Sequence, residues 1–253
     1  VIELDAGRDV VQRLSELRPD VVFNALHGRW GEDGSIQGLL EWLRIPYTHS
    51  GVMASALAMD KQRSKHIFSN SGLPTAPGSM INKSVLSTVH PLDKPYVVKP
   101  INEGSSIGVY FVNPKEDPPL KVASDMPSIV MVEEYIPGRE LTVTVMGKKA
   151  LAVTDIITQN WYDYDAKYKK GGSVHEVPAK IPKIIQEKCL EYALSAHELI
   201  GCRGISRADF RWDESLGLAG LILLEINTQP GMTPTSLAPE QAQICGIKSV
   251  SYT

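Results

Sequence analysis

The chain has 253 residues, of which 43% are hydrophobic and 22% charged, as is ordinary for a soluble globular protein of one large domain or two to three smaller ones. Its 26 basic and 29 acidic residues give a net charge of −3, so no basic field indicates a nucleic acid partner. No run of 18 apolar residues predicts a membrane span, and no signal peptide is recognised.

The cysteines indicate neither a disulfide framework nor a zinc site. Cys189, Cys202 and Cys245 are widely spaced and form no C-x-x-C pair, which favours reduced thiols in a cytosolic protein. No cysteine has a nearby histidine that would activate it, and no G-x-S-x-G motif occurs. Nucleophilic catalysis by a side chain of the protein is therefore poorly supported.

The first fifty residues are typical of alternating strands and helices. A glycine-rich loop, His27–Gly34, follows an apolar run and precedes a helical pattern. Parallel sheets bind ligands at such loops, so His27 is either a ligand contact or a core histidine. The pattern predicts helices over 10–17 and 35–43, a buried strand over 20–26 and a short strand over 45–48.

After this region the pattern changes from helices to hairpins. One helix is predicted over Ala54–Ser71, where Gly72 and Pro74 end it. The polar segment 160–173 predicts a mobile loop. Strands are predicted over 95–99, 109–112, 129–136, 140–146, 150–157, 206–212 and 221–227, with a long helix over 182–200 before the last hairpin.

The last hairpin carries the strongest chemical signal. Alternate side chains of a strand share a face, so Arg207 points with Asp209, and Glu225 points with Asn227. If the strands fold about Gly217 without a bulge, Asp209 lies opposite Glu225. Like charges across a ladder are unfavourable, and a hard divalent cation such as Mg²⁺ is the natural compensation.

The alternative for this hairpin is a solvated sheet face, which is what most charged strand residues form. The second strand, however, is apolar from Leu221 to Leu224, and its polar residues come at the carboxyl end before a loop, 228–233. Burial on both faces with acidic groups at the strand end therefore favours a site.

A second signal is the small-residue loop 102–108 between two predicted strands. Its backbone N–H groups and hydroxyls can bind phosphate, although the loop taken alone favours a plain β-turn. Lys99 directly before the loop strengthens the phosphate interpretation, and Lys61 is a second candidate cation. The loop matches neither the P-loop nor the G-x-G-x-x-G pattern.

Taken in order, the motifs resemble the D-alanine–D-alanine ligase family. The resemblance runs from about Asp20 to Gly246. It rests on the sequences at 27–41 (HGRWGEDGSIQGLLE), 59–61 (MDK), 99–108 (KPINEGSSIG), 162–168 (YDYDAKY), 207–209 (RAD) and 225–233 (EINTQPGMT).

The resemblance implies an ATP-grasp fold of mixed α/β and α+β character. Two α+β subdomains would hold ATP between them, behind a partial N-terminal α/β substrate domain with a parallel sheet. The expected divisions are residues 1–52 for the substrate domain, 53–134 for the central subdomain and 135–253 for the C-terminal subdomain with the metal site and mobile loop.

The resemblance also implies a role for each matching residue. The expected catalytic residues are Ser105, Tyr168, Arg207 and Gly231. ATP would be bound by Lys61, Lys99, Glu103, Gly104, Ser106, the hinge Glu133, Glu134, Tyr135 and Ile136, and the ribose-binding Glu140. D-Alanine would be bound by His27, Lys167, Ser236 and Leu237. Two Mg²⁺ ions, with Mn²⁺ as a substitute, would be held by Asp209, Glu225 and Asn227.

The implied reaction converts D-alanine to an acyl phosphate with ATP, after which the amine of a second D-alanine displaces phosphate. Relatives suggest a homodimer in the bacterial cytoplasm, acting in peptidoglycan precursor synthesis without nucleic acid or membrane partners. A D-alanine–D-lactate type ligase is the alternative within enzymes, although the loop tyrosine, Tyr168, favours the dipeptide. A truncated ATP-binding module without turnover is the other alternative, because the family's glycine-rich start and final helix are not recognised here.

Overall fold

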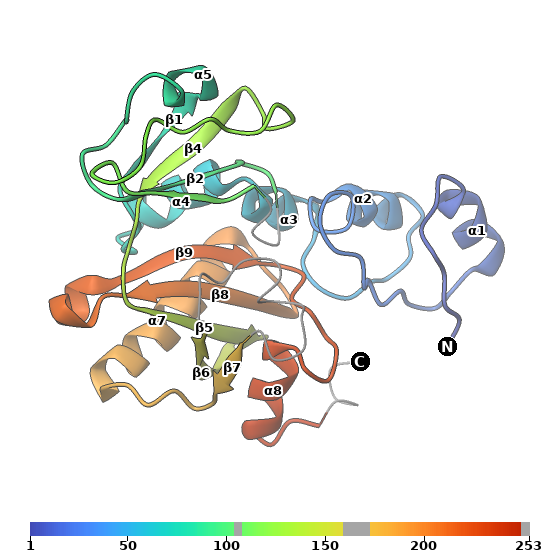
Figure 1. Cartoon of the computed structure of the whole chain (residues 1–253). Helices are drawn as coiled ribbons and strands as arrows, with labels where there is room; N and C mark the ends of the chain where they lie inside the picture. Colours follow the sequence, from blue (N-terminus) through green and yellow to red (C-terminus); the bar gives the residue numbers. More distant parts are fainter. Residues whose placement is uncertain (104–107, 159–172, 249–253) are drawn as a thin grey trace.

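The computed structural model describes residues 1–103, 108–158 and 173–248, and two antiparallel sheets dominate it (Figure 1). The four-stranded sheet has the order β1 (Gly78–Asn82), β4 (Ile129–Glu134), β2 (Tyr96–Lys99), β3 (Tyr110–Val112). The five-stranded sheet has the order β7 (Val174–Glu176), β6 (Lys149–Ile157), β5 (Arg139–Met146), β8 (Ile205–Trp212), β9 (Leu221–Asn227).

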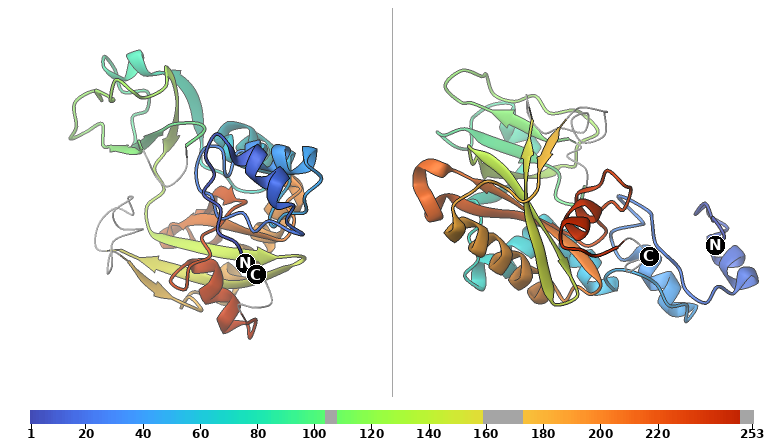
Figure 2. Two further views of the ribbon diagram at one scale, coloured as in Figure 1. Left: turned by 90° about the vertical axis from the view of Figure 1, so that its right-hand side faces the viewer. Right: turned by 90° about the horizontal axis from the view of Figure 1, so that it is seen from below.

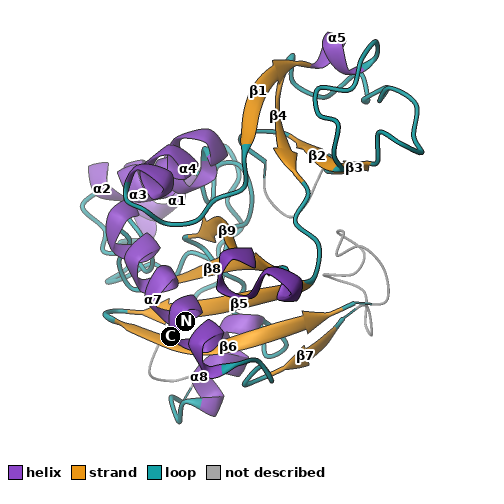
Figure 3. Cartoon of the chain, turned by 90° about the vertical axis from the view of Figure 1, so that its left-hand side faces the viewer, coloured by secondary structure: helices purple, strands orange, loops and turns teal. Residues whose placement is uncertain are grey.

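Helices cover the five-stranded sheet on both faces, with α7 (Lys183–Ile200) on one side of the strands and α8 (Leu237–Ile244) on the other (Figures 2 and 3). The core under α7 also receives α3 (Val52–Met59) and α4 (Lys61–Asn70). On the α8 side, buried Gln241 bonds to sheet groups of Thr142, Thr144 and Thr154. Alternating apolar and Thr residues in β5 thus fill both layers.

The smaller sheet buries one face in its own core and leaves the other for polar groups. Its core is formed under α5 (Lys83–Leu86) by Leu86, Tyr96, Val98, Val112, Met126, Val130 and Val132. Lys99 and Glu133 alternate with these apolar residues along β2 and β4, so both point to the opposite face.

The N-terminal region differs from the parallel sheet that the sequence predicts. Helices α1 (Val10–Leu17) and α2 (Ser35–Trp42) form as expected. The predicted strands, however, meet only in an isolated parallel bridge between Val22 and Tyr47, and Val21 and Phe23 are exposed. The predicted buried strand is wrong here because a parallel strand needs paired neighbours and covered faces, and this pair of segments has neither within the described residues.

The single helix predicted over 54–71 is two helices. Asp60, in extended conformation with φ −83° and ψ 95°, separates α3 from α4. Its carboxylate accepts a hydrogen bond of 3.0 Å from the Arg63 N–H, which caps the start of α4. Residues 52–59 are almost all apolar and residues 61–70 are largely polar, so a change in composition and the capping aspartate together mark the break.

The strand predicted over 129–136 ends at Glu134, and the segment 135–138 then crosses from the four-stranded to the five-stranded sheet (Figure 1). Gly138 has φ 90°, and a Cβ there would lie 2.1 Å from the Trp212 carbonyl oxygen. The crossing therefore packs directly on the end of β8. Both conformation and space require glycine at this position.

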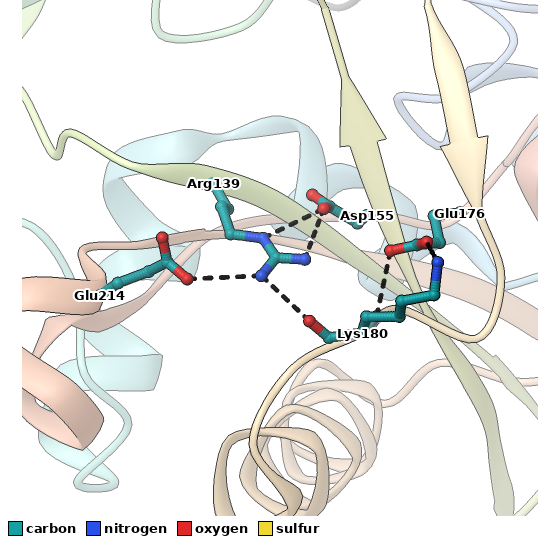
Figure 4. A network of polar contacts seen from close by, with 5 residues as sticks. All are labelled: Arg139, Asp155, Glu176, Lys180 and Glu214. Atoms are coloured by element: carbon teal, nitrogen blue, oxygen red, sulfur yellow. Dashed lines mark hydrogen bonds and ion pairs between the residues drawn. The ribbon is translucent and has the colours of Figure 1, made fainter.

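An ion-pair network fastens the same end of the larger sheet (Figure 4). Arg139, the first residue of β5, donates to one Asp155 carboxylate oxygen at 2.6 and 3.0 Å. It also contacts the Lys180 carbonyl at 3.1 Å and Glu214 at 3.4 Å. Because its partners come from three other segments, this arginine has a structural task.

Several features were not predicted by the sequence patterns, among them β1, α5, β7, α8 and the 3₁₀ segment Glu214–Gly220 that turns the last hairpin. The three cysteines are free, as expected. Burial raises the pKa of the Cys189 thiol to about 12 and that of Cys202 to about 11. Among the helices of the described residues, none is long and apolar enough to cross a membrane.

Candidate active site

The charged residues predicted to form a site lie together on the polar face of the β8–β9 hairpin. Asp209 pairs with Glu225 and Arg207 with Asn227, as predicted. The assumption of an unbulged hairpin is wrong, because the register shifts between Asp209 and Phe210, leaving Leu224 as an extra residue in β9. The core-facing residues of both strands remain apolar, and the charges remain on the other face.

Asp209 is buried and held by four hydrogen bonds. Arg207 donates to both carboxylate oxygens, at 2.8 and 2.7 Å, in a bidentate pair. The Thr142 hydroxyl donates at 2.6 Å and the Asn227 amide at 2.8 Å. These four bonds together fix the orientation of this carboxylate.

Glu225, the second carboxylate, lies near the start of α4. The Lys61 Nζ atom is 3.4 Å from its Oε2 atom and also donates a 2.6 Å hydrogen bond to the Glu103 carbonyl. The positive charges of Arg207 and Lys61 thus compensate the negative charges of the two carboxylates. The sequence had predicted that a metal ion alone would do so.

A buried ion triad forms on the facing side of the four-stranded sheet. The Glu133 carboxylate pairs with Lys99 through one oxygen and with Lys65 through the other. Burial acts to raise the pKa of Glu133, but the two ammonium groups outweigh it and hold the pKa below its usual value. Burial lowers the pKa of Lys65, although Glu133 opposes this shift. Lys65 is a residue that the sequence reasoning missed.

The predicted hinge and ribose residues come together around Arg211, which the sequence reasoning also missed. Its guanidinium donates to the Ile136 carbonyl at 3.1 Å and to the Tyr135 hydroxyl at 3.2 Å. It also lies 3.6 Å from a Glu140 carboxylate oxygen. Glu134 is further out, where it pairs with Lys94 at 3.0 Å.

The loop after β9 connects the hairpin to the N-terminal region. The Gln229 amide donates to the Asn24 carbonyl, and the Asn24 amide donates to Gln229 at 3.4 Å and to the Gly31 carbonyl at 3.0 Å. Both residues are buried, with about 3% of their surface exposed. The glycine-rich loop of the N-terminal region is thereby held against the loop that contains Gly231.

The predicted acceptor residues Ser236 and Leu237 lie at the start of α8. The Ser236 hydroxyl accepts a hydrogen bond of 3.1 Å from the Thr233 N–H, and Leu237 is buried. A helix N-terminus carries partial positive charge and suits a carboxylate. A Cβ on Gly231 would lie 2.8 Å from the Ser236 hydroxyl oxygen, so this turn is tight.

His27 is half-exposed, and its Nδ1 atom lies 3.2 Å from Glu32. The core-histidine alternative is therefore wrong, while its contact with a substrate stays a prediction. Five further predicted residues lie outside the described residues, namely Gly104, Ser105, Ser106, Lys167 and Tyr168. The same holds for nearly all of the expected mobile loop.

The donor set suits a divalent cation of the hard type. No group of three or more His, Cys, Asp or Glu side chains that could hold a metal occurs within the described ranges. Asp209, Glu225 and the Asn227 amide nevertheless offer oxygens on one face, and the amide can present its oxygen after a flip. Phosphate oxygens would complete such a shell, so Mg²⁺ bound together with a nucleotide fits these residues.

Two antiparallel sheets, with Lys99 and Glu133 on the polar face of one and Asp209 and Glu225 on the polar face of the other, are typical of ATP-dependent ligases of the ATP-grasp class. Residues 5–50 match the family described as D-ala D-ala ligase N-terminus, and residues 67–251 match the D-ala D-ala ligase C-terminus. The chain belongs to the D-alanine–D-alanine ligase family.

Individual relatives and solved structures agree with this assignment. A D-alanine–D-alanine ligase of Ruegeria pomeroyi is 63% identical over 98% of this chain and 81% of its own length, and one of Cereibacter sphaeroides is 64% identical over 98% and 80%. The ATP complex of the Bacillus anthracis D-alanine–D-alanine ligase has a TM-score of 0.73 at 26% identity, covering 95% of this chain and 78% of that one. The VanG D-Ala:D-Ser ligase of Enterococcus faecalis has a TM-score of 0.77 at 30% identity over 91% and 69%.

Proposed function

We propose that this enzyme joins two D-alanine molecules at the expense of one ATP, supplying D-alanyl-D-alanine for peptidoglycan precursors. The observation that carries the proposal is the meeting of Lys61, Glu225 and the Arg207–Asp209 pair on one face of the β8–β9 hairpin. A set of fixed charges of both signs is what positioning and charge neutralisation in phosphoryl transfer require.

In the first step the carboxylate of one D-alanine attacks the γ-phosphorus of ATP. This forms a D-alanyl phosphate and breaks the bond between the γ-phosphorus and the bridging oxygen, which leaves with the bonding electron pair as part of ADP. Lys61 and Lys99 would neutralise phosphate oxygens, and Asp209, Glu225 and Asn227 would hold two Mg²⁺ ions, with Mn²⁺ able to replace them. The metal supplies charge neutralisation at the phosphates when it is bound.

In the second step the neutral amine of the other D-alanine attacks the acyl carbon, and inorganic phosphate leaves with the bonding electron pair. Arg207 and the Gly231 N–H would stabilise the oxyanion that forms on the acyl oxygen. Asp209 holds the Arg207 guanidinium in one orientation. Ser236 and Leu237 at the N-terminus of α8 would receive the acceptor's carboxylate, and His27 would lie near the first D-alanine.

The remaining roles rest on the family resemblance. The segment 133–136 would bind adenine and Glu140 the ribose hydroxyls, with Glu103 in the phosphate loop. We also infer a homodimer located in the cytoplasm, and we retain the division at residues 52 and 134 as the domain boundaries. Light scattering on the purified protein tests the dimer, and limited proteolysis tests the boundaries.

The decisive experiment measures phosphate release with ATP, Mg²⁺ and D-alanine, together with chromatography of the product. We expect release that depends on D-alanine and a dipeptide in equal amount. ATP binding without phosphate release would indicate a nucleotide-binding module, and a preferred depsipeptide in mixed D-alanine and D-lactate would indicate the D-lactate type of ligase. Either outcome would overturn the proposal.

A further inference from the structure

We propose that Arg211 is a positioning residue for the adenosine part of ATP, acting through the segment that crosses between the two sheets. This inference rests on the proposed function, because it concerns the same nucleotide. Arg211 lies two residues beyond Asp209 on β8, and hence on the same face of the sheet. Along that face Arg207, Asp209 and Arg211 follow one another at the repeat of a strand, about 7 Å apart.

Each nitrogen of the Arg211 guanidinium has a different partner. The Nε atom donates to the Ile136 carbonyl at 3.1 Å, and the Nη2 atom donates to the Tyr135 hydroxyl at 3.2 Å. The Nη1 atom lies 3.6 Å from the Glu140 carboxylate, and Glu140 is also the cross-strand neighbour of Arg211 in the β5–β8 ladder. The guanidinium carbon is 5.6 Å from the centre of the Tyr135 ring, within the range of a cation–π contact.

These contacts fix a segment that lies outside both sheets. Residues 135–138 belong to no strand, yet they connect the two halves between which a nucleotide would lie. The Tyr135 N–H donates to the Pro95 carbonyl at 2.9 Å, and its ring packs edge-on against Phe111 at 4.8 Å. On the other side, the Arg211 side chain joins Tyr135 and Ile136 to β8. The Pro137 ring contributes stiffness, because it limits its own φ and the conformations of Ile136.

The consequence for a nucleotide follows from the groups that are held. A base that bonds to hinge backbone groups needs those peptide planes in one orientation, and the Arg211–Ile136 bond sets one of them. Ribose hydroxyls need the Glu140 carboxylate as an acceptor, and the neighbouring guanidinium holds that carboxylate in place. Arg211 and Glu140 are both less than a fifth exposed, so solvent screens their attraction only in part.

Lysine cannot replace this arrangement, because it has one nitrogen and no planar fork. We expect Arg211→Met to raise the KM and the dissociation constant for ATP about tenfold or more, because the loss of one charge-assisted hydrogen bond has an effect of this size. The turnover at saturating ATP and the KM for D-alanine should change less than threefold. Arg211→Lys should recover only part of the ATP affinity, and Tyr135→Phe, which removes one partner, should have a smaller effect in the same direction.

The experiment compares these variants with the control Arg13→Met. Arg13 lies in the remote helix α1, where its guanidinium donates a hydrogen bond to the Asp5 carbonyl. Melting temperature, ATP affinity by calorimetry and both KM values are measured on each preparation. Unchanged ATP affinity in Arg211→Met would overturn the proposal, as would an equal loss of every parameter together with early melting. If Arg211→Met fails to fold, Arg211→Lys and Tyr135→Phe decide by the same KM comparison. Because ATP affinity is measured without ligation, a wild-type protein that binds ATP but does not form dipeptide would refute the proposed function and not this role.

Discussion

Asp209 and Glu225 face each other across β8 and β9, and they share the site face because β9 contains one extra residue at Leu224. Without this bulge, the alternation that places Leu221 and Leu223 in the core would turn Glu225 into the core as well. The bulge restores the alternation one residue later, so Ile226 is buried and Glu225 is not. Bulges are common next to active sites, where they re-aim side chains in this way.

Glu225→Gln should abolish ligation and leave the fold intact. The substitution keeps the shape of the side chain but removes one negative charge from a site with few carboxylates, which weakens Mg²⁺ binding. The partner Lys61, at 3.4 Å, loses little because the Glu225 side chain is 27% exposed. Turnover is measured against Mg²⁺ concentration, with the exposed Glu187→Gln on α7 as the charge-matched control. A rate that is unchanged at limiting Mg²⁺ would remove Glu225 from the metal site.

Arg207→Ala should lower turnover by about 10²–10³, the usual cost of removing one oxyanion donor, while ATP affinity changes much less. Asp209 keeps its bonds from Thr142 and Asn227, so we expect the fold to survive. Arg207→Lys should recover little activity, since it retains the charge but not the bidentate pair. Melting temperature, ATP affinity and turnover are measured together. Early melting with weak ATP binding would show that the Arg207–Asp209 pair is only structural.

Asn24→Ala and Gln229→Ala should each raise the KM for D-alanine more than the KM for ATP. The two buried amides hold the loop with His27 against the loop with Gly231. Each single substitution leaves a buried polar group unpaired, at a cost of about 1–3 kcal/mol in stability. The double variant should lose less stability than the sum of the two single losses, because the two residues are in contact. Strict additivity in KM and in unfolding free energy would contradict this coupling.

Folding stability should fall between pH 6.5 and pH 4 because of His49. Burial lowers its pKa from 6.5 to about 4, and its Nε2 atom has no hydrogen-bond partner. Below pH 6.5 the unfolded chain takes up a proton that the folded protein does not, so stability is lost as the pH falls, by about 3 kcal/mol at pH 4. His49→Asn should remove this part of the loss, since asparagine tolerates the positive φ of 72° at this position.

The test for His49 is urea unfolding of both proteins at several pH values across this range. The difference in unfolding free energy between the two proteins separates the contribution of His49 from that of His197. Burial also lowers the pKa of His197. Parallel curves for wild type and His49→Asn would show that the folded protein accommodates the charged ring.

The sequence by itself determined the hairpins of the larger sheet and the residues of its polar face. Gly147 in a turn and Gly201 at a helix end both have positive φ. The sequence of a few residues is enough to encode such features. The pairing of Arg207 with Asn227 was predicted, but it depends on the bulge at Leu224, which local alternation does not show. The ordered motifs were specific enough to indicate the family before any fold was known.

The tertiary structure alone decided which distant groups meet. Lys65 has the pattern of a solvated helical lysine, yet it pairs with Glu133, 68 residues away, because α4, packed with α7 in the core of the larger sheet, places it next to β4. Arg211 reaches Ile136 across 75 residues, and Gln229 reaches Asn24 across 205. The expected parallel sheet did not form from residues 20–26 and 45–48, since strand formation depends on neighbours that local pattern cannot supply. Such contacts arise from the packing of whole elements, where burial makes each polar pairing obligatory.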